Sequence, residues 1–149
     1  MKAPMPTITK REQMGAVYVR VQLSNAMDVE MVEHGLLEAG KVRSCNVLAL
    51  VDTGATKSII PPAIVEELGL SIHRETMGIL ADGSRVPCGV SSTVRFEIQG
   101  RETREDAYVL GDEVLIGQTV LESTDLLVNC ADRTVIPNPA HPEGPVLRL

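Results

Sequence analysis

The alternation of apolar and polar residues predicts a chain built mainly from β-strands. Residues 14–23 carry an aliphatic side chain at every second position in their later part, which is typical of a strand with one buried face. Residues 94–98 alternate in the same way with charged residues. Residues 99–101 then predict a turn into a further strand that ends near residues 108–110.

Between and after these segments the pattern predicts one polar excursion and several more strands. Residues 25–40 are polar and acidic and contain two glycines, so we expect them to leave the sheet. Residues 41–51 predict the returning strand, which ends in a continuous aliphatic run. Residues 114–117 and 126–128 are apolar and predict two further strands.

Two short helices are predicted beside these strands. Pro61 and Pro62 begin the first, because proline is favoured in the first turn of a helix. Gly69 is suited to cap its C-terminus. The expected buried stripe of this helix consists of Ile64, Val65 and Leu68. Residues 118–123 predict the second helix, so the expected fold class is all-β with one or two short helices.

A protruding hairpin is predicted in the middle of the chain. Residues 72–80 and 85–90 have the character of strands and flank the tetrapeptide Ala81-Asp82-Gly83-Ser84. An Asp-Gly pair between two strands is a strong hairpin signal, because glycine adopts the positive φ angle that tight turns require.

The strand over residues 41–51 leads directly into Asp52-Thr53-Gly54-Ala55. A carboxylate that activates water must be held rigidly and must allow a second carboxylate to approach closely, which the small Gly54 and Ala55 permit. Their backbone amides can brace the Asp52 oxygens, and Thr53 offers a hydroxyl for an interface. This pattern is typical of half an aspartic peptidase active site. The alternative interpretation is a turn that ends a strand and carries a solvated Asp.

Composition narrows the classes of partner. With 149 residues, 44% apolar and 23% charged, residues 1–149 are expected to form one globular domain, with a flexible N-terminus over 1–12 and a proline-rich tail over 137–149. A net charge of −6 argues against nucleic acid or an anionic membrane as the main partner. The three aromatic residues offer no platform for stacking bases. We therefore expect a peptide or protein partner.

Targeting signals and a disulfide framework are both missing from the sequence. No apolar h-region follows Met1, and no apolar stretch reaches the length of a membrane span, so a cytoplasmic location is expected. The cysteines are three in number and widely spaced, and we expect buried, reduced thiols. They are Cys45, Cys88 and Cys130.

Other chemistries lack their usual signatures. The sequence contains no His-Glu-x-x-His, no Gly-x-Ser-x-Gly and no phosphate-binding Gly-Lys-Ser/Thr segment. His34, His73 and His141 are scattered, so a surface or structural role is expected for each, with neither a metal nor a cofactor. Acidic and basic residues alternate over residues 101–106, which predicts a solvated strand face.

Taken together, these motifs resemble those of the bacterial members of the retropepsin-like aspartic peptidases. Residues 50–55 match the catalytic loop of that family, Leu80-Ala81-Asp82-Gly83 resembles its flap, and Val114-Leu115-Ile116-Gly117 resembles its apolar-apolar-Gly motif. The three motifs occur in the order of the family, and the ending over residues 138–149 is similar to that of bacterial sequences of this type.

The resemblance implies a closed β-barrel of the acid protease type with its active site at a homodimer interface. The chain holds one Asp-Thr-Gly whereas the chemistry uses two carboxylates, so each subunit contributes Asp52, supported by Thr53 and Gly54. The two carboxylates share one proton and act together as acid and base in peptide hydrolysis. The residues expected to bind substrate are Ala55, Leu80, Ala81, Asp82, Gly83 and Ser84.

Two departures from the viral enzymes accompany the resemblance. Thr56 stands where those enzymes usually carry Asp, and the segment over residues 25–40 is absent from their compact chains. The alternative function is a dimeric peptide-binding or scaffold module that has the same fold and cleaves nothing. The intact Asp52 favours the enzyme. Two carboxylates packed together destabilise a dimer unless they are protonated, and a module that cleaves nothing would have no need of them.

Overall fold

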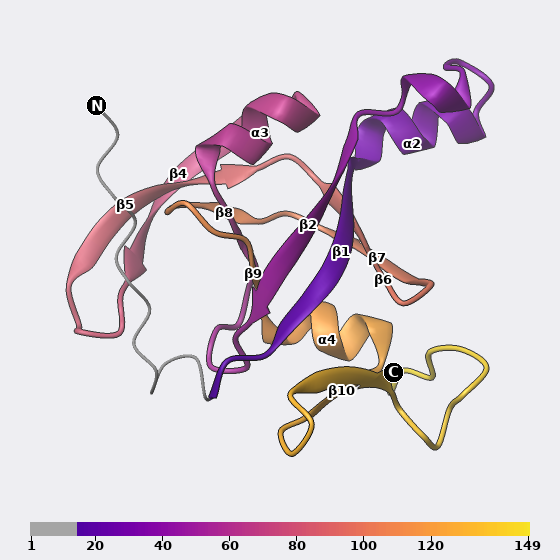
Figure 1. Cartoon of the computed structure of the whole chain (residues 1–149). Coiled ribbons are helices and arrows are strands. Elements are labelled where there is room, and N and C mark those ends of the chain that lie inside the picture. Colours follow the sequence, from indigo (N-terminus) through magenta and orange to yellow (C-terminus); the bar gives the residue numbers. More distant parts are fainter. Residues whose placement is uncertain (1–14) are drawn as a thin grey trace.

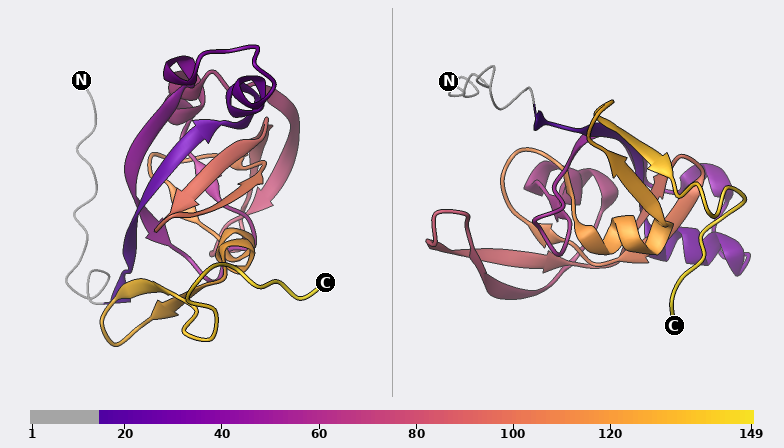
Figure 2. Two further views of the ribbon diagram at one scale, coloured as in Figure 1. Left: turned by 90° about the vertical axis from the view of Figure 1, so that its right-hand side faces the viewer. Right: turned by 90° about the horizontal axis from the view of Figure 1, so that it is seen from below.

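The computed structural model describes residues 15–149, so the prediction for residues 1–12 and the start of the first predicted strand at Met14 lie outside it. A single nine-stranded sheet dominates the structure, in the order β4-β5-β8-β3-β9-β2-β1-β6-β7. The sheet curls around the core, which confirms the mostly β fold class (Figures 1 and 2). A separate two-stranded sheet pairs β10 with β11.

The strands and helices have the following bounds. The strands are β1 (Tyr18–Asn25), β2 (Ser44–Val51), β3 (Ile59–Ile60), β4 (Ile72–Ile79), β5 (Arg85–Ser91), β6 (Val94–Ile98), β7 (Arg101–Glu105), β8 (Tyr108–Val109), β9 (Leu115–Ile116), β10 (Leu126–Asn129) and β11 (Thr134–Pro137). The helices are α2 (Ala26–Glu33), the 3₁₀ turn η1 (Ala39–Lys41), α3 (Pro62–Leu68) and α4 (Gln118–Thr124).

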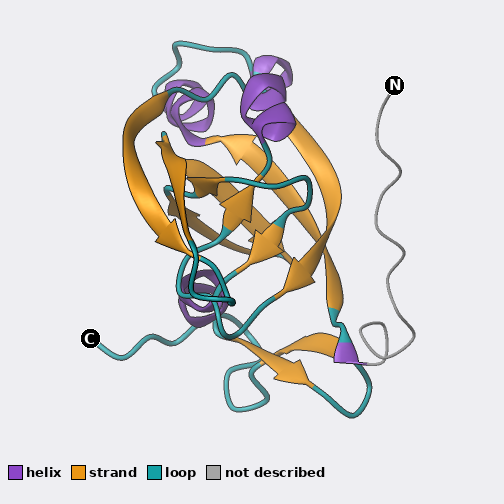
Figure 3. Cartoon of the chain, turned by 90° about the vertical axis from the view of Figure 1, so that its left-hand side faces the viewer, coloured by secondary structure: helices purple, strands orange, loops and turns teal. Residues whose placement is uncertain are grey.

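Alternation along β1 and β6 builds the core, as their sequences predict. Val19, Val21 and Leu23 are buried on one face of β1, and Phe96 and Ile98 are buried on the same side of its neighbour β6. Figure 3 shows α2 and α3 at one end of the sheet and α4 at the other. Residues 52–55, which we call the Asp52 loop, follow β2 and lie at the end occupied by α4.

Three secondary-structure predictions needed correction. Residues 25–40 contain α2, which begins because the Asn25 side chain accepts a hydrogen bond from the Asp28 amide and caps the helix. The strand predicted to run to residue 110 is two strands, β7 and β8, which lie far apart in the order of the sheet. Residues 134–137, which were not predicted to form a strand, form β11 ahead of the proline-rich tail, and β11 tolerates Pro137 because it is paired only with β10.

Two predictions about burial were also wrong. Arg101 does not belong to a solvated face: it is only 7% exposed and donates hydrogen bonds to the carbonyls of Thr124, Asp125 and His141. Cys88 is buried as expected, but Cys45 is half-buried and Cys130 is exposed in the turn between β10 and β11. All three are free thiols, and burial raises the pKa of Cys45 to about 11.

A polar cluster joins α2 to the rest of the molecule. Asn25 donates a hydrogen bond to the Leu68 carbonyl at 2.9 Å, which ties the start of α2 to the end of α3. Asp28 is buried and accepts hydrogen bonds from the backbone and the guanidinium of Arg43. The guanidinium in turn covers Gly69, the left-handed cap of α3 with φ of 62°.

Replacing Gly69 with Ala is expected to lower the free energy of unfolding by about 1–2 kcal/mol, because the residue has a positive φ. The added Cβ would also lie 1.8 Å from Arg43, so the guanidinium must move. Urea denaturation measures the effect, with Gly40→Ala as the control, since Gly40 has open space around it and no positive φ. Equal stability of the two variants would contradict this role of Gly69.

Asp28 is expected to contribute to the acid sensitivity of folding. Hydrogen bonds from Arg43 lower the pKa of Asp28 below its ordinary value despite its burial. A carboxyl group with a lowered pKa stabilises the fold above its unfolded pKa of about 3.9, and this stabilisation is lost as pH falls through the folded value. Asp28→Asn should therefore lower the free energy of unfolding by about 1–2 kcal/mol at pH 7. Between about pH 4 and 2, denaturant titrations should show a smaller decrease in the free energy of unfolding for this variant than for the unaltered protein. Parallel pH profiles for the two proteins would contradict this.

Candidate active site

Asp52 lies immediately beyond β2, where β2 and β9 run parallel. Its amide donates to the Ile116 carbonyl at 2.9 Å, which extends the pairing of β2 with β9 by one residue. The Gly54 amide donates to Asp52 Oδ1 at 3.0 Å. The residue is half-buried. The loop therefore presents one oriented carboxylate that remains accessible.

The backbone amides of Gly54 and Ala55 donate to different acceptors. Gly54 braces the Asp52 carboxylate as expected, and a Cβ at this position would lie 3.2 Å from Oδ1. The Ala55 amide instead donates to the backbone carbonyl of Asp52 at 3.1 Å, so its predicted contact with the carboxylate is wrong. Ala55 closes the turn, and Thr53 at its tip is exposed.

The N-terminal end of α4 contacts the other side of the Asp52 loop. The amides of Gln118 and Thr119 donate to the carbonyls of Ala55 and Thr56 at 2.8 and 3.0 Å. Gly117 lies against the loop so closely that a Cβ would stand 2.5 Å from the Lys57 carbonyl oxygen. The glycine of the apolar-apolar-Gly motif is therefore required for close backbone approach.

Ser58 is a supporting residue that the sequence analysis missed. It is fully buried, and its hydroxyl accepts a hydrogen bond from the Gly117 amide at 3.0 Å. The signal in the sequence was slight: a small polar residue directly before the apolar pair Ile59-Ile60. Because its partner lies 59 residues away, the role becomes visible only in the folded chain.

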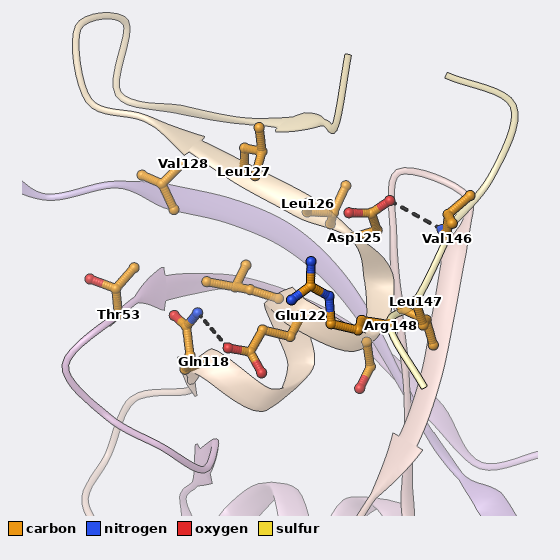
Figure 4. Close-up of a pocket in the computed structure, with 12 residues that line it drawn as sticks. Thr53, Gln118, Glu122, Asp125, Leu126, Leu127, Val128, Val146, Leu147 and Arg148 are labelled. Atoms are coloured by element: carbon orange, nitrogen blue, oxygen red, sulfur yellow. Dashed lines mark hydrogen bonds between the residues drawn. The ribbon is translucent and has the colours of Figure 1, made fainter. Parts of the chain in front are cut away.

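A groove of about 570 Å³ begins beside the Asp52 loop (Figure 4). Thr53 lies at one end, α4 and β10 form two walls, and the C-terminal residues Val146, Leu147 and Arg148 form a third. No pattern in the sequence connected this tail with the site. Half of the lining residues are aliphatic, and the polar ones are Thr53, Gln118, Glu122, Ser123, Asp125 and Arg148.

The predicted hairpin is present and projects from the far edge of the sheet. Strands β4 and β5 pair from Ile72↔Ser91 to Ile79↔Arg85, and the loop over residues 80–84 joins them. Gly83 supplies the positive φ of 85°, and Asp82 accepts hydrogen bonds from the amide and hydroxyl of Ser84. These bonds lower the pKa of Asp82, so the carboxylate stays charged and locked within the turn.

The structure brings the four residues of the Asp52 loop together but leaves the hairpin separate. Asp52, Thr53, Gly54 and Ala55 form one turn that follows an interior strand, whereas Leu80–Ser84 join the two strands at one edge of the sheet. Both reach toward the same end of the molecule in Figure 1. The groove beside Thr53 contains no hairpin residue.

Charges near the loop are paired in ways that fix its position. Lys57 Nζ contacts Asp106 Oδ1 at 2.9 Å, and this contact raises the pKa of Lys57. Thr119 donates to Glu105 at 2.7 Å, which ties α4 to β7.

Within residues 15–149 no group of three or more His, Cys, Asp or Glu side chains is arranged to hold a metal ion. Over the same range, no helix is long and apolar enough to cross a bilayer.

Comparison with known families gives one match that spans the site. A family described as "gag-polyprotein putative aspartyl protease" matches residues 39–123, more than half of the chain. This range contains the Asp52 loop, the hairpin and most of α4. No curated protein has a significant match to the sequence.

Solved structures with retroviral-type folds are also similar. The retroviral protease-like domain of Ddi1 from Leishmania major is 15% identical with a TM-score of 0.50, and the match covers 89% of this chain and 94% of that one. EIAV protease complexed with the inhibitor HBY-793 is 24% identical with a TM-score of 0.42, over 51% of this chain and 74% of that one. The Ddi1 domain shows that the fold is retropepsin-like.

Proposed function

Because the chain belongs to this family of gag-polyprotein aspartyl proteases, we propose that it is a homodimeric aspartic endopeptidase whose two Asp52 carboxylates hydrolyse an extended peptide. The observation that carries the proposal is the geometry of Asp52. Its carboxylate is oriented by the Gly54 amide at 3.0 Å and stays accessible immediately after β2.

A second copy completes the chemistry. Each subunit supplies one Asp-Thr-Gly, and a two-fold axis beside the exposed Thr53 brings the two Asp52 side chains together. One carboxylate takes a proton from water as the water oxygen attacks the peptide carbonyl carbon, and the other gives its proton to the carbonyl oxygen. Collapse of the tetrahedral intermediate breaks the C–N bond, and the amine leaves with a proton from the pair.

The hairpin acts as the flap of this proposed enzyme. The turn over residues 80–84 closes over the peptide, and its backbone pairs with the extended substrate by strand addition. Ala55 and the turn residues contact the substrate. The exposed Met77 and Ile79 on β4 support this role, because large apolar side chains on a projecting hairpin are suited to cover a ligand.

Replacing Gly83 with Val is expected to reduce peptide turnover about tenfold or more, because a β-branched residue disfavours the positive φ that shapes the turn. Gly100→Val is the matched control. Gly100 has a φ of 79° and equally open surroundings, but it joins β6 to β7 at the other edge of the sheet. The two variants should lose similar stability by thermal unfolding, with turnover lost only in Gly83→Val. Equal turnover in both would show that the hairpin is not the flap.

Cleavage of a diverse peptide library tests the proposed function. The intact protein should cut members of the library between about pH 4 and 7, where a carboxylate pair can hold a single proton. Mass spectrometry of the products identifies the cut bonds, and the same reaction with Asp52→Asn supplies the background. A dimeric protein that cuts no peptide above this background would favour the non-catalytic binding module.

A further inference from the structure

The solvent-facing side of α2 carries apolar side chains. Asp28 is buried and Val32, one turn further along, is half-buried, so these two residues mark the side that packs on the molecule. Met27 and Met31 are spaced in the same way on another side, and Met27 is 68% exposed. Methionine on the solvent side of a helix is the reverse of the usual amphipathic pattern.

The end of α2 adds a leucine to this apolar surface. Gly35 has a φ of 71°, and its amide donates to the Val32 carbonyl at 3.0 Å. The Leu36 amide donates to the Met31 carbonyl at 2.8 Å. In a helix end with these two bonds, the residue after the glycine is close to the residue that accepts its amide. Leu36 is 72% exposed, so it extends the surface, and we call Met27, Met31 and Leu36 the apolar stripe.

Polar contacts, rather than apolar packing, attach α2 to the molecule. Asn25 at its start binds the Leu68 carbonyl, Asp28 binds Arg43, and Glu33 pairs with Arg104 at 2.7 Å. A helix this short is normally stabilised by packing an apolar face on the core. Six apolar residues of this segment lie outside the main hydrophobic core of residues 15–149, namely Met27, Val29, Met31, Val32, Leu36 and Leu37. The apolar stripe is therefore free to pack against another molecule.

The end of the molecule that carries the stripe is acidic. Residues 26–43 and 62–69, which include α2 and α3 at the same end in Figure 3, contain six carboxylates and two cations. Arg43, one of these cations, is paired with Asp28. Glu30 lies on α2 next to the stripe and contacts His34 at 3.8 Å. The other exposed carboxylates without a role above are Glu38, Glu66 and Glu67. Such a surface attracts a basic partner and repels an anionic bilayer.

The shape of the stripe favours a helical partner. Side chains four residues apart form a ridge along α2, and such a ridge fits the groove between the side chains of a second helix. The flexible methionine side chain can adapt to the surface that it meets. Together with the surrounding carboxylates, this geometry matches a helix that is apolar on one side and carries lysine or arginine beside that side.

We propose that the apolar stripe of α2 is a docking surface for a basic amphipathic helix of another protein. The Asp52 loop lies at the opposite end of the sheet, beside α4, so a bound helix leaves this loop open (Figure 3). The inference goes beyond the proposed function, because docking at α2 requires no cleavage and no second carboxylate.

A synthetic peptide tests the proposal with the full chain. The probe is a labelled peptide of leucine and lysine, about 18 residues or five turns long, with all leucines on one side of the helix. Its control has the same composition in an order that spreads the leucines around the helix. Fluorescence anisotropy gives the Kd of each peptide. We expect the amphipathic probe to bind at least about tenfold more tightly than its control.

Substitutions in the stripe locate the binding. Met27→Gln and Leu36→Gln remove apolar surface at exposed positions, and each should raise the Kd of the probe at least about tenfold. Leu48→Gln is the matched control, because Leu48 is also exposed but lies on β2. Its Kd should equal that of the unaltered protein. Far-UV circular dichroism checks that all three variants retain the fold.

A second pair of variants tests the charge complementarity. Glu30→Lys reverses a charge beside the stripe, whereas Glu143→Lys reverses an exposed charge in the C-terminal tail. Glu30→Lys should weaken binding of the probe several-fold, and Glu143→Lys should change it much less. Raising the salt concentration from about 50 to 500 mM should reduce this difference, because salt screens exposed charges.

Four results would overturn the proposal. The first is no binding of the probe up to about 1 mM, and the second is equal binding of the probe and its control. The third is equal binding of the probe by the Met27, Leu36 and Leu48 variants, which would mean non-specific attraction to an acidic protein. The fourth is a dimer Kd, measured by sedimentation velocity, that rises in Met27→Gln, because the stripe would then be a contact between copies. None of these results depends on peptide cleavage, so the proposed function is tested separately.

Discussion

Asp52→Asn is expected to reduce peptide cleavage at least about a thousandfold, because the amide can neither take a proton from water nor return one to the leaving group. The fold should be retained, since the Asn side-chain oxygen can still accept from the Gly54 amide. The dimer should be at least as stable, because the substitution removes a carboxylate from beside its own copy. Initial rates on a peptide found in the library test measure the loss.

Glu38→Gln is the control for this substitution. It also converts a carboxylate to an amide, but Glu38 is exposed and directly precedes η1, outside the Asp52 loop. Its rate should match that of the unaltered protein. Residual cleavage by Asp52→Asn at a comparable rate would show that another group performs the hydrolysis.

The second large effect concerns protein concentration. A monomer holds half of the proposed site, so the rate per subunit should fall in proportion to concentration once the protein is diluted well below its dimer Kd. Over a hundredfold dilution in that range the loss approaches about a hundredfold. The measurement is the initial rate per subunit, with an inert carrier protein present to prevent adsorption. A constant rate per subunit far below an independently measured Kd would contradict a shared site.

The sequence predicted those parts of the fold that depend on residues close together in the chain. Alternation in β1 and β6 reflects burial on one face, and the Asp82-Gly83 turn reflects the backbone that glycine allows. Gly69 caps α3 for the same reason, because glycine readily adopts a positive φ angle. The Asp52 loop was recognisable as a candidate site because a strand, a carboxylate and small residues are adjacent in the sequence itself.

The features that were missed depend on partners distant in sequence. Arg101 alternates with acidic residues and therefore looked solvated, but its acceptors are carbonyls 23 to 40 residues further along the chain. The break between β7 and β8 arises because Tyr108 pairs with β3 and β5 rather than continuing β7. Asn25 reads as a polar loop residue, although it caps α2 and binds the end of α3 at once.

In the candidate site, too, contacts between neighbouring residues were predicted and contacts between distant residues were not. The contact of the Gly54 amide with the Asp52 carboxylate was predicted, but Ser58, the close approach at Gly117 and the tail beside Thr53 were not. Each of these joins segments that only the tertiary structure brings together. Periodicity and turn propensity contain no information about such contacts.

The central claim is that each active site takes one Asp52 from each of two subunits, and subunit mixing tests it most directly. The unaltered protein and Asp52→Asn are mixed in varied ratios at a fixed total concentration above the dimer Kd, and cleavage is measured after the subunits exchange. Only dimers of two unaltered subunits should be active, so an equal mixture should retain about a quarter of the full rate. An equal mixture that retains about half, with a linear dependence on the unaltered fraction, would mean that each subunit acts alone.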